Sequence, residues 1–240
     1  MLPDRSFNEF VLKFANINGS GSASANLLCA KALFRMGLPV SPKNIFPSNI
    51  QGLPTWYEIR ISEAGHLARR EGSDVMVAMN PQTYAQDAAE VVSGGTIIYD
   101  STWPRDFARG DVTQIGIPIA RLCAEAWADP RQRQLLKNIV YVGALAWLIE
   151  IDMVILEKLI AEQFKTKPKL VDSNLQALHM GRDWVAEHVG ERLAVRVRKA
   201  NGTAGKIMMS GNEAAGLGAV FAGATVAAWY PLTPSTSVAE

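Results

Sequence analysis

Residues 11–37 read VLKFANINGSGSASANLLCAKALFRMG, and this stretch decides the fold class. Residues 11–15 are almost continuously apolar and predict a buried strand. The Gly- and Ser-rich segment 16–22 predicts a turn, and apolar residues then recur at helical spacing over 23–36 until Gly37 ends the helix. A strand, a glycine loop and a helix in that order are typical of the start of an α/β unit.

The same alternation continues along the chain. We expect further strands over 57–62, 74–79, 96–99 and 112–117, and helices after Asn80-Pro81 and over 119–126, 129–149, 152–164 and 174–187. The Asn-Pro and Asp-Pro pairs predict helix starts, because proline suits the first helical position and the residue before it caps the helix.

Four features of this pattern are open to test by a structure. Residues 39–56 contain four prolines and predict a long irregular loop. The alternating residues 57–62 predict a half-exposed strand. Gly94-Gly95 predicts the end of a helix, and Asp87 and Glu90 predict a solvated helix face.

The chain ends in a different way from how it begins. Residues 191–206 carry several basic residues and predict a solvated linker, although the alternation over 195–198 also permits a short strand. Residues 211–218 predict a tightly packed helix, followed by a short strand and a threonine between prolines, Thr233. A domain of ~100 residues cannot be completed in the space left before Glu240. We therefore expect either that a second domain is missing or that this segment docks on another chain.

Composition excludes several classes of function. The chain has 240 residues and a net charge of +1, which argues against nucleic-acid binding, because that calls for a basic face. Cys29 and Cys123 are far apart without CxxC spacing, so we expect buried free thiols and no iron–sulfur cluster held by this chain alone. No uncharged apolar run reaches ~18 residues, so we expect no membrane span and a cytoplasmic location. The three histidines lack ligand spacing, and no metal site is predicted.

The glycine loop is the first candidate site, and it comprises Asn18, Gly19, Ser20, Gly21 and Ser22. Backbone N–H groups at a helix N-terminus can bind an anion such as a phosphate or a carboxylate. The loop differs from a dinucleotide fingerprint, because a serine replaces the third glycine and no acidic residue ends the next strand. A tight turn without a ligand is the alternative.

The second candidate is the loop over residues 48–57, in which Gln51, Gly52, Thr55 and Trp56 form an amphipathic set. Such a set suits a subunit interface or a ligand lid. The alternative is a packed surface loop anchored by Trp56.

Several motifs together resemble 2-oxoacid:ferredoxin oxidoreductases, which depend on thiamine diphosphate. The C-terminal segment resembles the start of the alpha part of that family, and the preceding two-thirds resembles its gamma domain, most like the 2-oxoglutarate branch. The motifs that carry the resemblance are residues 18–26, 44–60, 77–83, 129–135, Gly211-Asn212-Glu213-Ala214 and Tyr230-Pro231-Leu232-Thr233-Pro234-Ser235.

The resemblance implies a fold and an organisation. It implies a three-layer Rossmann-like gamma domain with a helical C-terminal cluster over residues 1–190 and a linker over 191–206. The start of an alpha-type, pyrimidine-like α/β domain would follow over 207–240. Thr233 would contact the substrate and the thiazolium of the cofactor, with Tyr230, Pro231, Pro234 and Ser235 beside it.

The resemblance also implies a reaction. A 2-oxoacid, expected to be 2-oxoglutarate, would be oxidatively decarboxylated to acyl-CoA and CO2, with ferredoxin as the electron acceptor. Coenzyme A would be the co-substrate. A partner beta subunit would hold the [4Fe-4S] clusters and most of the site for thiamine diphosphate and its Mg. The assembly would be a dimer of heterodimers, and this chain alone would bind no cofactor firmly. We expect the isolated chain to be inactive, because the glutamate that activates the cofactor would lie beyond Glu240.

Two alternatives stay open from the residues themselves. One is a stand-alone α/β module that binds an anion or coenzyme A through the glycine loop. The other is a structural interaction subunit without catalysis.

Overall fold

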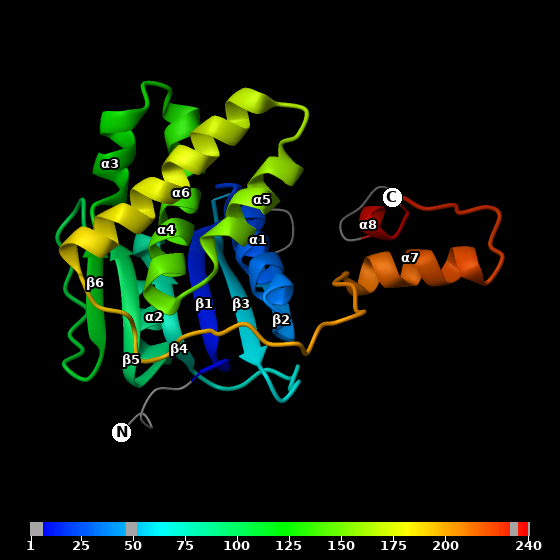
Figure 1. Cartoon of the computed structure of the whole chain (residues 1–240), viewed down its shortest axis with the longest axis horizontal. Helices are drawn as coiled ribbons and strands as arrows, with labels where there is room; N and C mark the ends of the chain where they lie inside the picture. The colour runs from blue at the N-terminus through cyan, green and yellow to red at the C-terminus, as the bar shows by residue number, and fades with distance from the viewer. Residues whose placement is uncertain (1–6, 47–51, 231–234, 240) are drawn as a thin grey trace.

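The computed structural model describes residues 7–46, 52–230 and 235–239. Its centre is a six-stranded sheet in the order β2-β3-β1-β4-β5-β6 (Figure 1). β1, β4, β5 and β6 are mutually parallel, whereas β3 runs antiparallel to both β1 and β2. The strands are β1 (Glu9–Ile17), β2 (Val40–Ile45), β3 (Pro54–Ser62), β4 (Ser73–Ala78), β5 (Val91–Asp100) and β6 (Thr113–Ile117).

Helices cover both faces of the sheet, so the predicted α/β class is confirmed. Alternate residues of β1, such as Phe10 and Phe14, pack into a large apolar core with the helices of one face. The opposite face of the sheet, including Ala15 of β1, packs against the short helix α2 through Ala88. The helices of the first face are α1 (Ser22–Arg35), α3 (Ile119–Ala126), α4 (Pro130–Ile149), α5 (Met153–Gln163) and α6 (Pro168–His188), and the second face carries η1 (Pro81–Thr83) and α2 (Tyr84–Glu90).

The predicted helix starts are confirmed where a short polar side chain precedes the helix. The Asn80 side chain accepts a hydrogen bond from Gln82 N at 3.1 Å, and the Asp129 side chain accepts one from Arg131 N at 2.9 Å. α6 begins well before the predicted residue 174, at Pro168, where the proline occupies the first turn.

The expectation of an irregular loop over residues 39–56 was wrong. Residues 40–45 form β2, which pairs along its length with β3, and β3 itself begins at Pro54. Pro42 lies in this strand, which is at the edge of the sheet, where a residue without an N–H group is tolerated.

The expectation that Gly94-Gly95 ends a helix was also wrong. α2 ends at Glu90, and the two glycines lie inside β5, which begins at Val91. The pairing of β5 with β4 shifts register here, and Gly94 has a φ of 79°. The glycines therefore accommodate a bulge in a strand.

Residues 57–62 of β3 are all buried, and not half-exposed as predicted. The acidic residue Glu58 receives two hydrogen bonds from Arg69, at 2.9 and 2.8 Å, and Arg60 pairs with Glu9. Charged side chains at alternating positions looked solvated in sequence, but partners distant along the chain allow their burial.

The segment over residues 191–206 is not a solvated connector. Leu193 and Val197 are buried, and their backbone N–H groups donate to the carbonyl oxygens of Leu148 and Ile149, both at 2.9 Å. The segment is therefore fastened across the C-terminal end of α4.

The last helices, α7 (Gly211–Phe221) and α8 (Thr236–Ala239), lie to one side of the α/β unit (Figure 1). No residue of α7 is buried, so the predicted tight packing is found only at Gly216, whose Cα faces the carbonyl of Val238 closely. Residues 224–230 form no strand, contrary to expectation. None of the helices in the described ranges is long and apolar enough to cross a membrane.

Candidate functional site

The candidate site lies at the edge of the sheet where the parallel strands end. β1, β4 and β5 finish at Ile17, Ala78 and Asp100, and Pro54 at the start of β3 pairs with Ile17. After β1 the chain first adds β2 and β3 on one side of β1, and it then adds β4, β5 and β6 on the other side of β1. A crevice at such a switch in strand order is the usual ligand position in open α/β sheets.

The structure brings together the two loops that sequence analysis treated separately. Asn18 N donates to the carbonyl oxygen of Leu53 at 2.8 Å, and Gly52 N donates to that of Asn18 at 3.1 Å. The glycine loop and the return into β3 therefore form one hydrogen-bonded unit.

This unit encloses a cavity of about 350 Å3, which we call the glycine-loop cavity. Its lining combines predicted residues of both loops with the end of β1 and the edge strand, namely Asn16, Asn18, Gly19, Gly21, Ser22, Ala23, Asn26, Asn44, Thr55, Trp56 and Tyr57. Of the predicted loop residues, Ser20 faces a neighbouring cavity instead, and Gln51 lies outside the described residues. Gly52 is not part of the lining and contributes through its hydrogen bond to Asn18.

The N-terminus of α1 opens at this cavity. Gly21 occupies the cap position with a φ of 79°, and Gly19 has a φ of 84°, a left-handed conformation that favours glycine. No side chain caps the helix and its first turn holds no acidic residue. Its first backbone N–H groups are therefore available to an anion, and the helix dipole favours negative charge there.

A second cavity, of about 480 Å3, lies on the other side of the end of β1. Asn16 belongs to both cavities, and Ser20, Met79, Asp100 and Lys137 line the second. Within the described part of the chain, Asn16 Nδ2 and Ser20 Oγ are buried without a partner in hydrogen-bond geometry.

Asp100, the one carboxylate in the lining of the second cavity, already has partners. Its Oδ1 accepts hydrogen bonds from Thr102 N at 3.0 Å and Thr102 Oγ1 at 2.6 Å, and its Oδ2 accepts one from Ala120 N at 3.1 Å. It therefore caps α3 and orders the turn after β5.

The C-terminal motif is only partly described. Ser235 Oγ donates to the carbonyl oxygen of Tyr230 at 2.8 Å, and Tyr230 is exposed. Pro231, Thr233 and Pro234 lie outside the described residues. The catalytic role predicted for Thr233 therefore stays a prediction.

The described residues contain no set of side chains arranged to bind a metal ion. No group of three or more His, Cys, Asp or Glu side chains there could hold a metal ion. Cys29 and Cys123 are free and buried, as predicted, and burial raises the pKa of each thiol to about 12. These two cysteines do not fit an iron–sulfur cluster, which takes four ligands.

Sequence analysis missed two residues of this region. Asn16 could have been found, because a polar residue directly after a buried strand marks the carboxyl edge of a sheet. Asp87 was expected to be solvated and is fully buried, with partners from two elements. The sequence holds no local signal for that burial.

Comparison with known proteins agrees with this architecture. Residues 11–184 match the family model of pyruvate ferredoxin/flavodoxin oxidoreductase. Subunit KorA of the 2-oxoglutarate oxidoreductase of Mycobacterium tuberculosis is 25% identical over 98% of this chain and 41% of its own length. Subunit VorA of the ketoisovalerate oxidoreductase of Methanothermobacter thermautotrophicus is 30% identical over 78% of this chain and 38% of its own.

Solved structures extend the likeness to three dimensions. A 2-oxoglutarate:ferredoxin oxidoreductase from Magnetococcus marinus, with 2-oxoglutarate, coenzyme A and succinyl-CoA bound, matches 98% of this chain with a TM-score of 0.84 and 27% identity, over 41% of its own chain. The gamma subunit of a keto/oxoacid ferredoxin oxidoreductase from Geobacter sulfurreducens shares the fold over 72% of this chain and 96% of its own, with a TM-score of 0.59 and 19% identity. The chain thus spans about two fifths of the length of the curated relatives it matches.

Proposed function

The chain belongs to the pyruvate ferredoxin/flavodoxin oxidoreductase family, and from this premise we propose that it is part of a 2-oxoacid:ferredoxin oxidoreductase. The reaction would be oxidative decarboxylation of 2-oxoglutarate to an acyl-CoA and CO2, with ferredoxin as the electron acceptor. Residues 1–190 would be the gamma domain, 191–206 the linker and 207–240 the start of the alpha domain.

One observation carries the proposal for this chain's own contribution. The open N-terminus of α1 and the start of β3 face one cavity, joined by hydrogen bonds between Asn18 and residues 52–53. A cavity of about 350 Å3 holds a charged group and its neighbours but not the whole of a large cofactor. We assign it to a phosphate-bearing part of coenzyme A, with backbone N–H groups of residues 22–24 as donors.

The remaining cofactors belong elsewhere in the assembly. The family implies thiamine diphosphate and iron–sulfur clusters, and the described residues offer no ligand set for a cluster. We place the clusters, thiamine diphosphate and its Mg mainly on a beta subunit, in a dimer of heterodimers. The buried free thiols suit a reducing compartment, which supports a cytoplasmic location.

Binding of coenzyme A to the purified chain tests the assignment. Ala23 is exposed, lies in the first turn of α1 and lines the glycine-loop cavity. A23D adds a carboxylate that stabilises a helix N-terminus but repels a phosphate, so calorimetry should show affinity falling at least about tenfold. A23N has nearly the same shape without the charge and should bind within about threefold of the wild type. Equal binding by A23D and the wild type would place the ligand elsewhere.

Turnover tests the assignment of the chemistry. The chain alone should not reduce a viologen dye with 2-oxoglutarate and coenzyme A, whereas adding a beta-type subunit and the rest of the alpha domain should restore reduction. Reduction by the chain alone would refute the division of roles.

A stand-alone anion-binding module is the second candidate, and one observation favours it. The glycine-loop cavity is lined entirely by residues of the α/β unit. Coenzyme A binding without any effect of a beta-type partner on affinity or turnover would favour this reading. The exposure of Phe221 (83%) and Trp229 (52%) instead favours docking of 207–240 on further protein.

A further inference from the structure

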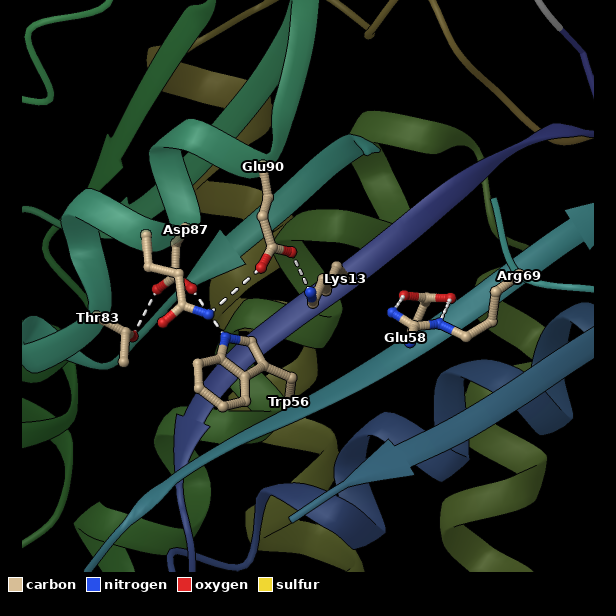
Figure 2. Close-up of polar contacts among 8 residues, drawn as sticks. Lys13, Trp56, Glu58, Arg69, Thr83, Asp87 and Glu90 are labelled. Carbon is tan, nitrogen blue, oxygen red and sulfur yellow. Dashed lines mark hydrogen bonds and ion pairs between the residues drawn. The ribbon is translucent and has the colours of Figure 1, made fainter. Parts of the chain in front are cut away.

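Asp87 is a buried carboxylate whose two hydrogen-bond donors come from different elements of the fold. It lies on α2, 0% exposed, and accepts two hydrogen bonds: one from Trp56 Nε1 at 2.8 Å and one from Thr83 Oγ1 at 2.6 Å (Figure 2). Burial of a carboxylate is costly unless donors compensate for the lost water. Removal from water raises the pKa of Asp87, while the two hydrogen bonds act in the opposite direction.

The donor Trp56 connects α2 to the glycine-loop cavity. It is the third residue of β3, and with its neighbours Thr55 and Tyr57 it lines that cavity. Its indole lies on the face of the sheet that α2 covers, and there Nε1 reaches Asp87 (Figure 2). The ammonium of Lys13, itself paired with Glu90, lies 5.9 Å from the centroid of the indole ring.

A second, weaker route joins the same helix to the cavity. Thr83 Oγ1 also lies 3.3 Å from the carbonyl oxygen of Asn80, and Asn80 Nδ2 donates to the carbonyl oxygen of Asn16 at 3.3 Å. Asn16 lines the cavity from β1. The two routes can be separated, because only one of them passes through Trp56.

We propose that Asp87 is a positioning residue for the glycine-loop cavity, which it acts on through its hydrogen bond with the Trp56 indole. The bond fixes the start of β3, and the start of β3 in turn holds Thr55 and the backbone of residues 52–53 against the glycine loop. The inference rests on the proposed role of the cavity in binding coenzyme A.

A thermodynamic cycle on coenzyme A affinity tests the inference in the full chain. D87A should weaken binding about tenfold, the loss expected when a charge-assisted hydrogen bond is removed, and D87N, which keeps an acceptor, should recover most of it. W56F should weaken binding to a similar degree. D87A in the W56F background should then add less than about twofold, because the bond is already lost.

T83V is the matched control, since it removes the other partner of Asp87 and leaves the bond to Trp56. It should bind coenzyme A within about threefold of the wild type. Additive losses from D87A and W56F, or a T83V loss equal to that of D87A, would mean that the effect of Asp87 on binding does not pass through the Trp56 indole, and would overturn the proposal. If W56F binds coenzyme A as tightly as the wild type, the proposal is also overturned, and this result does not depend on whether D87A folds.

The indole signal separates this inference from the proposed function. In a 15N–1H spectrum of the tryptophan side chains, the Trp56 Nε1–H peak, assigned with W56F, should shift strongly in D87A and little in T83V. A missing shift would refute the positioning itself. If the indole peak shifts but the wild type does not bind coenzyme A, the ligand assignment is refuted. The claim that Asp87 tunes the affinity for coenzyme A then fails with it.

Discussion

The crossing of α4 and α6 gives the sharpest prediction for stability. The two helices touch backbone to backbone at a pair of glycines. A Cβ atom on Gly181 would lie 1.9 Å from the carbonyl oxygen of Val140, and one on Gly143 would lie 1.8 Å from that of Leu178. Cβ atoms essentially never come within 3.0 Å of another heavy atom, so an alanine at either position must push the helices apart.

The substitution G181A has two opposing effects. Alanine favours a helix over glycine by about 1 kcal/mol. The clash is with backbone, which cannot rotate away, so it costs about 3 kcal/mol, the upper part of the usual range for overpacking. The net loss is about 2 kcal/mol in the free energy of unfolding, which lowers Tm by roughly 4–8 °C in a chain of this size.

Urea and thermal unfolding, followed by circular dichroism, measure this loss. G218A is the matched control, because Gly218 lies in the exposed helix α7, and apart from the adjoining backbone of that helix no atom lies within 4 Å of the position its Cβ would take. It gains the same helix propensity without a clash and should not lower stability. An unchanged or raised Tm for G181A would refute the backbone contact between α4 and α6.

Three further predictions follow from the described side chains. Because burial raises the pKa of the Cys29 and Cys123 thiols to about 12, both should react slowly with Ellman's reagent at pH 8 in the native chain and fast in urea; fast native reaction would contradict their burial. Burial also raises the pKa of Asp87 above its usual 3.8, so the native state binds this proton more tightly than the unfolded state. The contribution of Asp87 to stability should therefore fall as the pH rises from 3.8 through the raised pKa. In urea titrations the free energy of unfolding of D87N should depend less on pH than that of the wild type, and an equal pH dependence would argue against the raised pKa. The Ser210 hydroxyl caps α7 in a capping box with Glu213, so S210A should cost about 1 kcal/mol of helix stability, seen as faster amide exchange across α7, and unchanged exchange would show that the cap is not formed in solution.

The sequence by itself determined the features that depend on neighbours along the chain. The opening strand, glycine loop and helix, the capped starts of α4 and α5, and the burial of both cysteines all follow from apolar spacing and capping chemistry within a few residues. The resemblance of short motifs to a family was sufficient to predict membership, which the match over residues 11–184 confirms.

Only the tertiary structure decided the features that depend on partners distant in sequence. β2 exists because β3 offers it hydrogen-bonding groups, although its own residues read as a loop. Glu58 and Asp87 look solvated in sequence and are buried, because Arg69 in one case and Trp56 in the other supply donors. The glycine-loop cavity has the same origin: antiparallel pairing places Pro54 opposite Ile17, and this register carries the start of β3 to the open end of α1.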